Sequence, residues 1–83
     1  RRKRFIADIA KTLVKNNSKM YVPDLASLLN LNEIKTKYGA KYKGGRGTYK
    51  LISSTYDYYQ TNDPQTALNI ARAFVKPNGE YAY

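Results

Sequence analysis

The sequence predicts a mainly helical fold, a small helical bundle with a minor β element, and three observations lead to this prediction. Apolar side chains recur at helical spacing in four stretches of the chain. Residues that favour turns, among them Asn, Gly and Pro, separate these stretches. The length of 83 residues suits one domain with one core and leaves little room for a deep catalytic cleft. We therefore expect residues 1–83 to form a single domain.

The first predicted helix covers residues 2–16, because apolar side chains occupy one face and charged side chains mostly occupy the other. The short polar side chains of Asn16, Asn17 and Ser18 compete for backbone hydrogen bonds and end the helix. Its predicted apolar face consists of Phe5, Ile6, Ile9, Ala10, Leu13 and Val14.

A short strand and a two-turn helix are predicted next. Met20, Tyr21 and Val22 favour the strand, and Pro23 suits the first turn of the helix that follows. This helix ends near Asn30. Its apolar face consists of Leu25, Ala26, Leu28 and Leu29.

Residues 32–43 have a different pattern. Apolar or aromatic side chains alternate with lysines between residues 34 and 38, and Gly39 supplies a turn, which predicts an extended, hairpin-like stretch. A short helix from Glu33 to Tyr38, capped by Gly39, is the alternative, because periodicity does not separate strand from helix in runs this short.

A third helix is predicted from Thr48 to Gln60. Residues 44–47, Gly-Gly-Arg-Gly, form a flexible loop before it, and Thr48 is a competent N-cap. Helical spacing leaves Tyr58 exposed. The side chains expected to face the core are Leu51, Ile52, Tyr56 and Tyr59.

A fourth helix is predicted to start at Asp63 and Pro64, which suit the N-cap and the first helical position. Pro77 stops this helix, and the Asn-Gly pair after it favours a turn. Residues 80–83 are expected to form a terminal strand beside residues 20–22. The apolar face of the helix consists of Ala67, Leu68, Ala71, Phe74 and Val75.

The charge of the chain favours an anionic partner. Lys and Arg number 15 against 6 Asp and Glu, and the net charge of +9 attracts polyanions. Nucleic acid is the first candidate partner and an anionic membrane surface the second. No apolar run approaches the roughly 20 residues that a spanning helix needs, so we expect no membrane insertion and a soluble, cytoplasmic protein.

The composition argues against catalysis. The chain has no Cys and no His, which excludes disulfides and thiolate metal sites and removes the side chain most used for proton transfer near neutral pH. The acidic residues form no evident pair for acid–base chemistry. We therefore predict no enzymatic activity, no bound metal and no cofactor.

The segment from Lys35 to Lys50 carries the candidate binding site, because it holds six basic residues and no acidic one. Its glycine-rich loop runs into the predicted start of a helix, where free amide groups and the helix dipole favour phosphate. A solvated lysine-rich loop is the alternative interpretation. The residues expected to bind nucleic acid are Lys35, Lys37, Lys41, Tyr42, Lys43, Arg46, Thr48, Tyr49 and Lys50.

The first four residues, Arg-Arg-Lys-Arg, have two interpretations. They form a basic arm that reaches a phosphate or a minor groove, or they form a solvated tail or a cut linker. Arg1 stands where an initiator Met is usual, which is typical of a processed product or of a piece of a longer protein.

Part of this pattern resembles a known family. Residues 25–30, Leu-Ala-Ser-Leu-Leu-Asn, are followed by Ile34-Lys35-Thr36, by Tyr38-Gly39 and by Tyr42, and then by a helix with an apolar face. This order is similar to the helix-turn-helix segments of serine recombinases and of phage or plasmid proteins, within the helix-turn-helix and winged-helix superfamily.

The resemblance implies that the helix Thr48–Gln60 is a recognition helix, whose N-terminal residues meet base edges of double-stranded DNA. It also implies a setting in a transcription regulator or a mobile-element protein. The loop at residues 44–47 departs from the family pattern, and recombinase activity does not carry over because no domain with a serine nucleophile is present.

Binding of double-stranded DNA is therefore the expected function, with two alternatives. RNA or single-stranded nucleic acid is favoured if Tyr38, Tyr42, Tyr49 and Tyr58 form an exposed row on which bases stack. A protein-interaction domain with an acidic partner is favoured if the basic residues are scattered over different faces, where they only steer association.

Overall fold

The computed structural model describes all 83 residues, which form four helices and one small parallel sheet. This confirms the mainly helical fold with a minor β element. The elements in chain order are α1 (Arg2–Lys15), β1 (Met20–Tyr21), α2 (Val22–Leu31), α3 (Arg46–Gln60), α4 (Pro64–Ala73) and β2 (Phe74–Val75).

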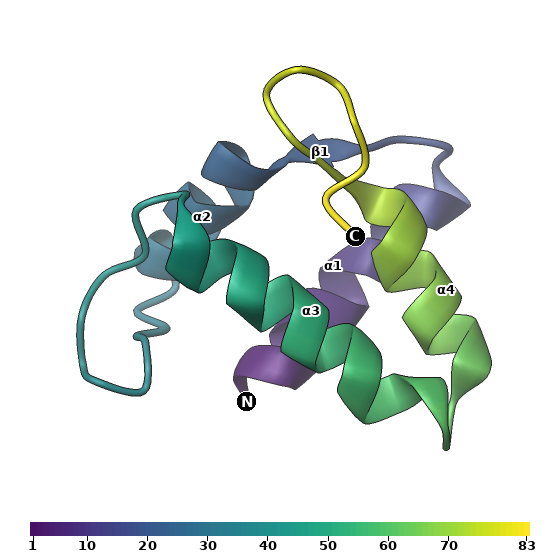
Figure 1. The fold of residues 1–83 in the computed structure, drawn as a ribbon, viewed down its shortest axis with the longest axis horizontal. Helices are drawn as coiled ribbons and strands as arrows, with labels where there is room; N and C mark the ends of the chain where they lie inside the picture. The colour runs from purple at the N-terminus through teal and green to yellow at the C-terminus, as the bar shows by residue number, and fades with distance from the viewer.

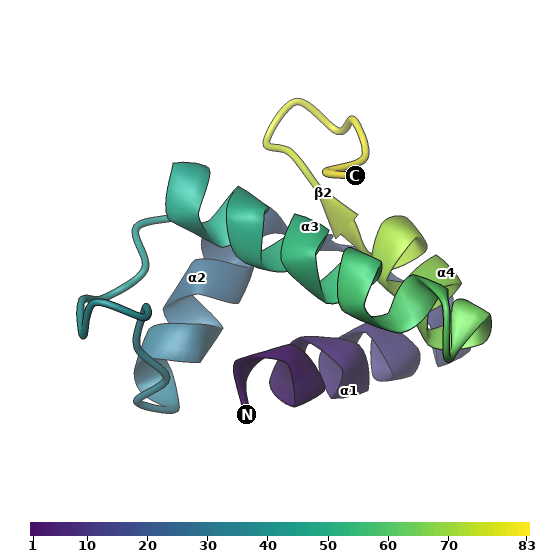
Figure 2. The same ribbon diagram turned by 60° about the horizontal axis from the view of Figure 1, so that its bottom comes forward.

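The helices enclose one core. In Figure 1, α3 crosses in front of α1, and α4 lies beside both; Figure 2 shows α1 beneath α3, with α2 at the end opposite α4. The most extensive packing joins α4 to α1 and α4 to α3. The core residues come from all of these elements: Ile6, Ala10, Val22, Leu25, Ala26, Leu29, Ile34, Tyr42, Leu51, Ile52, Ile70, Ala73 and Phe74. None of the four helices combines the length and the apolar character that a bilayer crossing requires.

Helix α1 confirms the first predicted helix almost to the residue. It ends where Asn17 adopts a left-handed φ of 54°, and the amide of Ser18 donates to the Leu13 carbonyl at 2.8 Å. The basic cluster at the chain start is the first turn of this helix and not an extended arm. Arg1 is held in addition by a 3.1 Å hydrogen bond from its guanidinium to the Asn32 carbonyl.

The sheet differs from the prediction. Met20 and Tyr21 pair in parallel with Phe74 and Val75, whereas Tyr81 makes only an isolated antiparallel bridge to Val75. Helix α4 ends at Ala73 because Phe74 is extended, with φ −117° and ψ 137°. Phe74, 1% exposed, therefore enters the core from a strand and not from the predicted helix.

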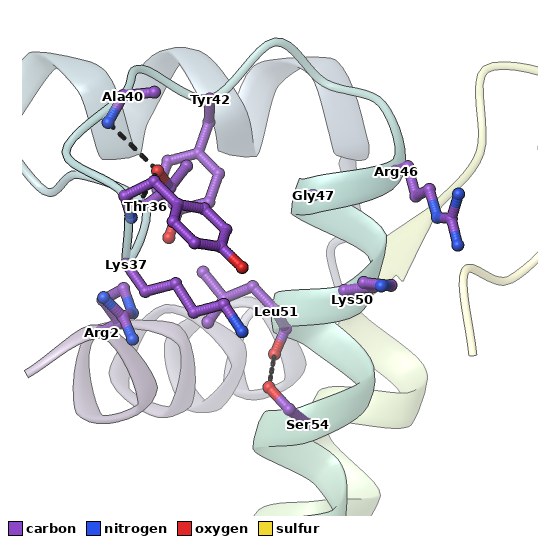
Figure 3. Close-up of a pocket in the computed structure, with 11 residues that line it drawn as sticks. Arg2, Thr36, Lys37, Ala40, Tyr42, Arg46, Gly47, Lys50, Leu51 and Ser54 are labelled. Atoms are coloured by element: carbon purple, nitrogen blue, oxygen red, sulfur yellow. Dashed lines mark hydrogen bonds between the residues drawn. The ribbon is translucent and has the colours of Figure 1, made fainter.

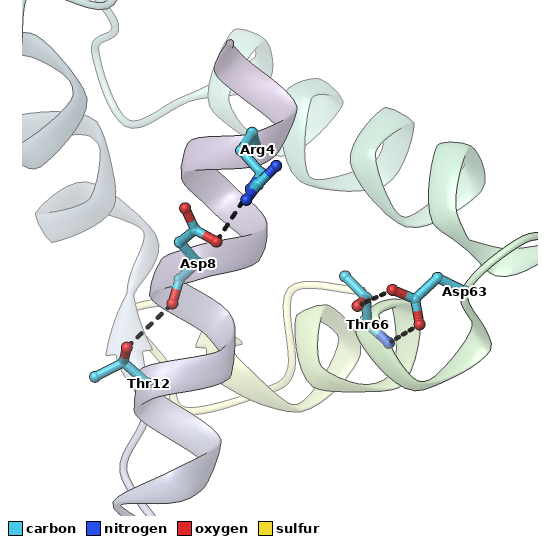
Figure 4. Close-up of polar contacts among 5 residues, drawn as sticks. All are labelled: Arg4, Asp8, Thr12, Asp63 and Thr66. Carbon is cyan, nitrogen blue, oxygen red and sulfur yellow. Dashed lines mark hydrogen bonds and ion pairs between the residues drawn. The ribbon is translucent and has the colours of Figure 1, made fainter.

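The predicted start of α4 is confirmed, and its predicted face is partly wrong. The Asp63 side chain accepts from the amide of Thr66 at 3.3 Å, as an N-cap does (Figure 4). Leu68 was expected to face the core and is 42% exposed, because the helix turns Ala67, Ile70 and Ala73 inward.

Residues 32–45, which connect α2 to α3, form neither the expected strands nor the alternative short helix. A tight turn closes where the Thr36 amide donates to the Ala40 carbonyl at 2.9 Å, and Gly39 takes a φ of 80° there. The loop then returns to α2, where Gly44, with a φ of 77°, packs against Pro23. A standard helix-turn-helix joins its helices by three or four residues, so the short turn of that motif is not present.

Helix α3 begins at Arg46, with Gly45 as its N-cap, and not at a Thr48 cap. Thr48 is the third residue of the helix and is 1% exposed, and its hydroxyl has no hydrogen-bond partner. The predicted inward face is confirmed: Leu51 and Ile52 are buried, and Tyr56 and Tyr59 pack partly buried against the core. Tyr58 is 62% exposed, as expected.

Candidate nucleic-acid interface

A groove of about 590 Å³ lies where the first half of α3, the turn at residues 36–40 and the first turn of α1 meet (Figure 3). Four of its lining residues are cations and none is acidic. They are Arg2, Lys37, Arg46 and Lys50. Residues far apart in sequence thus build one basic surface, which we call the α3 groove.

Three separate elements place the four cations. Arg2 is the first residue of α1, and Lys37 lies in the turn that the Thr36 hydroxyl organises by accepting from two amides, those of Tyr38 and Ala40. Arg46 and Lys50 lie one helical turn apart on α3, so they share a face.

The cations stand on both sides of α3. In Figure 3, Lys37 extends from the turn toward α3 and Arg2 lies on that same side, whereas Arg46 and Lys50 project from the other side of the helix. The first turns of α3 are therefore bracketed by positive charge.

The charges in the α3 groove are not neutralised within the protein. The one ion pair in the structure joins Arg4 to Asp8 at 3.5 Å, outside the groove and exposed (Figure 4). Helices α1 and α3 both start beside the groove without a side-chain cap and without an acidic residue in the first turn. The N-terminus of a helix carries a partial positive charge, so nearby cations are repelled by it. A bound anion relieves that repulsion.

Tyr42 forms part of the groove wall but is an anchor for the loop. Its amide donates to Asn30 Oδ1 at 2.8 Å, its carbonyl accepts from Asn30 Nδ2 at 2.7 Å, and its phenol donates to the Lys35 carbonyl at 3.3 Å. Burial raises the pKa of the Tyr42 phenol, and the nearby Arg2 charge opposes this in smaller measure. The phenol therefore stays protonated and keeps its role as a donor.

The structure brings together only some of the residues predicted to bind. Lys37, Arg46 and Lys50 line the α3 groove. Lys35, Lys41 and Lys43 are exposed but lie outside its lining. Three other predicted residues have their side chains directed wholly or partly to the core: Tyr42 is 6% exposed, Thr48 is 1% exposed, and Tyr49 is half-buried. Tyr42 and Thr48 therefore have little exposed surface with which to contact a partner.

Seven residues that line the α3 groove were not in the predicted site, namely Arg2, Thr36, Tyr38, Ala40, Gly47, Leu51 and Ser54. Ser54 had a detectable signal, since it follows Arg46 and Lys50 at intervals of four residues along one helical face. Arg2 belongs to the basic cluster interpreted above as an arm that reaches a phosphate, but only the crossing of α1 and α3 places it beside Arg46 and Lys50. Neither a family model, a curated protein nor a solved structure matches the chain, so its own geometry carries the functional argument.

Proposed function

We propose that this protein binds double-stranded DNA, with the first half of α3 in the major groove. One observation carries the proposal: Arg2 and Lys37 stand on one side of α3 and Arg46 and Lys50 on the other. A helix with its side chains is about 10–12 Å across, and the major groove is about 12 Å wide. A helix lying there has a phosphate backbone along each side, which is where the cations stand.

The cationic side chains around α3 make two kinds of contact in this proposal, with base edges and with phosphates. Arg46, at the first position of α3, is placed to meet a base edge or a flanking phosphate. Lys37, Lys50 and Arg2 contact phosphates, which fix the position of the protein without reading sequence. The lysines outside the α3 groove add to the field that attracts the duplex.

We infer that α2, the long connecting loop and α3 act as an extended variant of a helix-turn-helix. The resemblance of residues 25–60 to such segments in phage and plasmid proteins supports a cytoplasmic regulator or mobile-element protein. The proposal assigns the chain no catalytic activity.

The two alternatives are less well supported. Binding of RNA or single-stranded nucleic acid needs a row of exposed rings on which bases stack. Tyr42 is buried and Tyr49 is half-buried, and the sheet has only two strands of two residues. An acidic protein partner is favoured by Lys35, Lys41 and Lys43, which lie outside the α3 groove. It leaves unexplained why cations from three separate segments gather around α3.

Fluorescence anisotropy with a labelled duplex, its single strand and the matching RNA tests the proposal at about 50 and about 200 mM salt. We expect the duplex to bind most tightly. Lys37→Gln and Lys50→Gln should each reduce, by about 1, the magnitude of the slope of the logarithm of the binding constant against the logarithm of the salt concentration, here called the salt slope. Lys15→Gln, at the far end of α1, is the matched control and should leave it unchanged. Tighter binding of either single strand, or equal effects of all three variants, would refute the proposal.

A further inference from the structure

A second basic cavity, of about 540 Å³, lies between the first turn of α1 and the last turns of α3. Four of its six lining residues are cations, the other two are tyrosines, and none is acidic. They are Arg1, Arg2, Lys3, Arg4, Tyr58 and Tyr59. We call this the α1 cavity.

The protein itself satisfies few of these charges. Arg4 pairs with the exposed Asp8, and Arg1 is bound to a backbone carbonyl. The Lys3 ammonium lies 5.7 Å from the centre of the Tyr58 ring, which holds it at the cavity without neutralising it. Arg2 has no carboxylate partner and lines both the α1 cavity and the α3 groove.

The two sites lie along one stripe of α3. Arg46, Lys50, Ser54 and Tyr58 are spaced by four residues, and all four are exposed. Each step of four residues also turns about 40° around a helix, so this row winds partly around α3 over a length of about 18 Å. The stripe starts at the α3 groove and ends at the α1 cavity, with Arg2 beside both.

We propose that the α1 cavity is a second phosphate-binding site for the same duplex, occupied by phosphates beyond those that flank the first turns of α3. This inference rests on the proposed function. A duplex carries one phosphate per about 1.7 Å of its axis, both strands counted, so a row about 18 Å long extends past the phosphates beside the first turns of α3. Guanidinium forks, an ammonium and the Tyr58 hydroxyl all donate hydrogen bonds, as phosphate oxygens require.

Lysine acetylation of the whole chain, with and without duplex DNA, tests whether the duplex occupies the α1 cavity. Mass spectrometry measures the acetylation rate of each lysine. The expected result is that the duplex slows acetylation of Lys3 together with Lys37 and Lys50, while Lys15 reacts at an unchanged rate. Protection of Lys37 and Lys50 without Lys3 would overturn the α1 cavity and leave the proposed function intact. Protection of none of the three would overturn both.

A variant series supplies the second readout. Lys3→Gln should reduce the salt slope of duplex binding by about 0.9, and Lys15→Gln should not change it. An acidic peptide, poly-glutamate, is the competing ligand in the same acetylation assay. Stronger protection of Lys3 by poly-glutamate than by duplex of equal charge would overturn the assignment to phosphate. An unchanged slope for Lys3→Gln in a folded protein would also overturn it.

Discussion

The side-chain amide of Asn30 pairs with both backbone groups of Tyr42, accepting from its amide at 2.8 Å and donating to its carbonyl at 2.7 Å. Asn30 lies in α2 and Tyr42 in the loop, so this pair fixes how the loop approaches the helix. The loop turn that carries Lys37 is joined to α2 through this pair of hydrogen bonds. The α3 groove therefore depends on an asparagine that does not line it.

Asn30→Ala should destabilise the protein by about 1–3 kcal/mol, because two partly buried backbone groups of Tyr42 lose their partners. Urea unfolding measures this loss, and amide exchange at Tyr42 should become faster. Asn32→Ala is the control, since the Asn32 side chain bonds only within its own helix end at an exposed position. An unchanged exchange rate at Tyr42 would show that the pair does not hold the loop.

Gly44→Ala and Gly47→Ala should change stability in opposite directions. Gly44 has a φ of 77°, and an added Cβ would lie 3.2 Å from the Pro23 Cα, so the substitution should cost about 1–3 kcal/mol. Gly47 lies in α3 with open space around it, and Ala there should stabilise by about 0.5–1 kcal/mol. Thermal unfolding of both variants measures the difference. The same sign for both would contradict the backbone geometry described for the loop.

Thr48→Val should stabilise the fold by about 1 kcal/mol. The Thr48 hydroxyl is buried without a partner, and Val removes that polar group while keeping the shape of the side chain. Thr55→Val is the matched control, since the equally buried Thr55 hydroxyl donates to the Leu51 carbonyl and its loss brings no gain. Duplex binding should stay unchanged in Thr48→Val; a weaker complex would restore Thr48 to the interface.

Arg46→Ala separates reading of bases from contact with phosphate. If Arg46 reads a base, its loss should cost about 1–3 kcal/mol on a selected DNA site and less on random duplex. Competition binding with the two DNAs measures both values. Equal losses would make Arg46 a phosphate contact. No loss on either DNA, with the fold intact, would remove the start of α3 from the interface and favour an acidic protein partner.

Stability should fall above about pH 10 partly through Tyr42. Burial raises its pKa in the folded protein above 10.0, so its contribution to stability is complete below that pH. The contribution is lost as the pH rises through the folded pKa. Tyr42→Phe should flatten this part of the pH profile of urea unfolding. A profile identical to that of the unsubstituted protein would contradict a buried phenol.

Local signals in the sequence predicted the helices apart from the start of α3, because capping residues and apolar spacing act within a few residues. Asp63 with Pro64 marked the start of α4, and Asn17 the end of α1. The strand at Phe74 was mistaken for helix because its partner, Met20, is remote in sequence and helical spacing continues through Ala73. Periodicity does not encode such pairing.

The same distinction separates the predicted from the unpredicted parts of the site. Lys37, Arg46 and Lys50 belong to a basic segment that composition alone identifies. Arg2 joins them only through packing of α1 against α3. The burial of Tyr42 depends on Asn30, twelve positions earlier, and an aromatic residue between two lysines gives no sign of it.

The parallel pairing of Met20–Tyr21 with Phe74–Val75 joins the first third of the chain to its last. Closing so long a loop costs conformational entropy before the contact returns any energy, so we expect this pairing to form late in folding. The packing of α1 against α4 follows the same long-range closure. We therefore expect Arg2 and Arg46 to flank α3 only in the complete fold, so that proteolytic fragments without α4 and β2 should lose the charged surface.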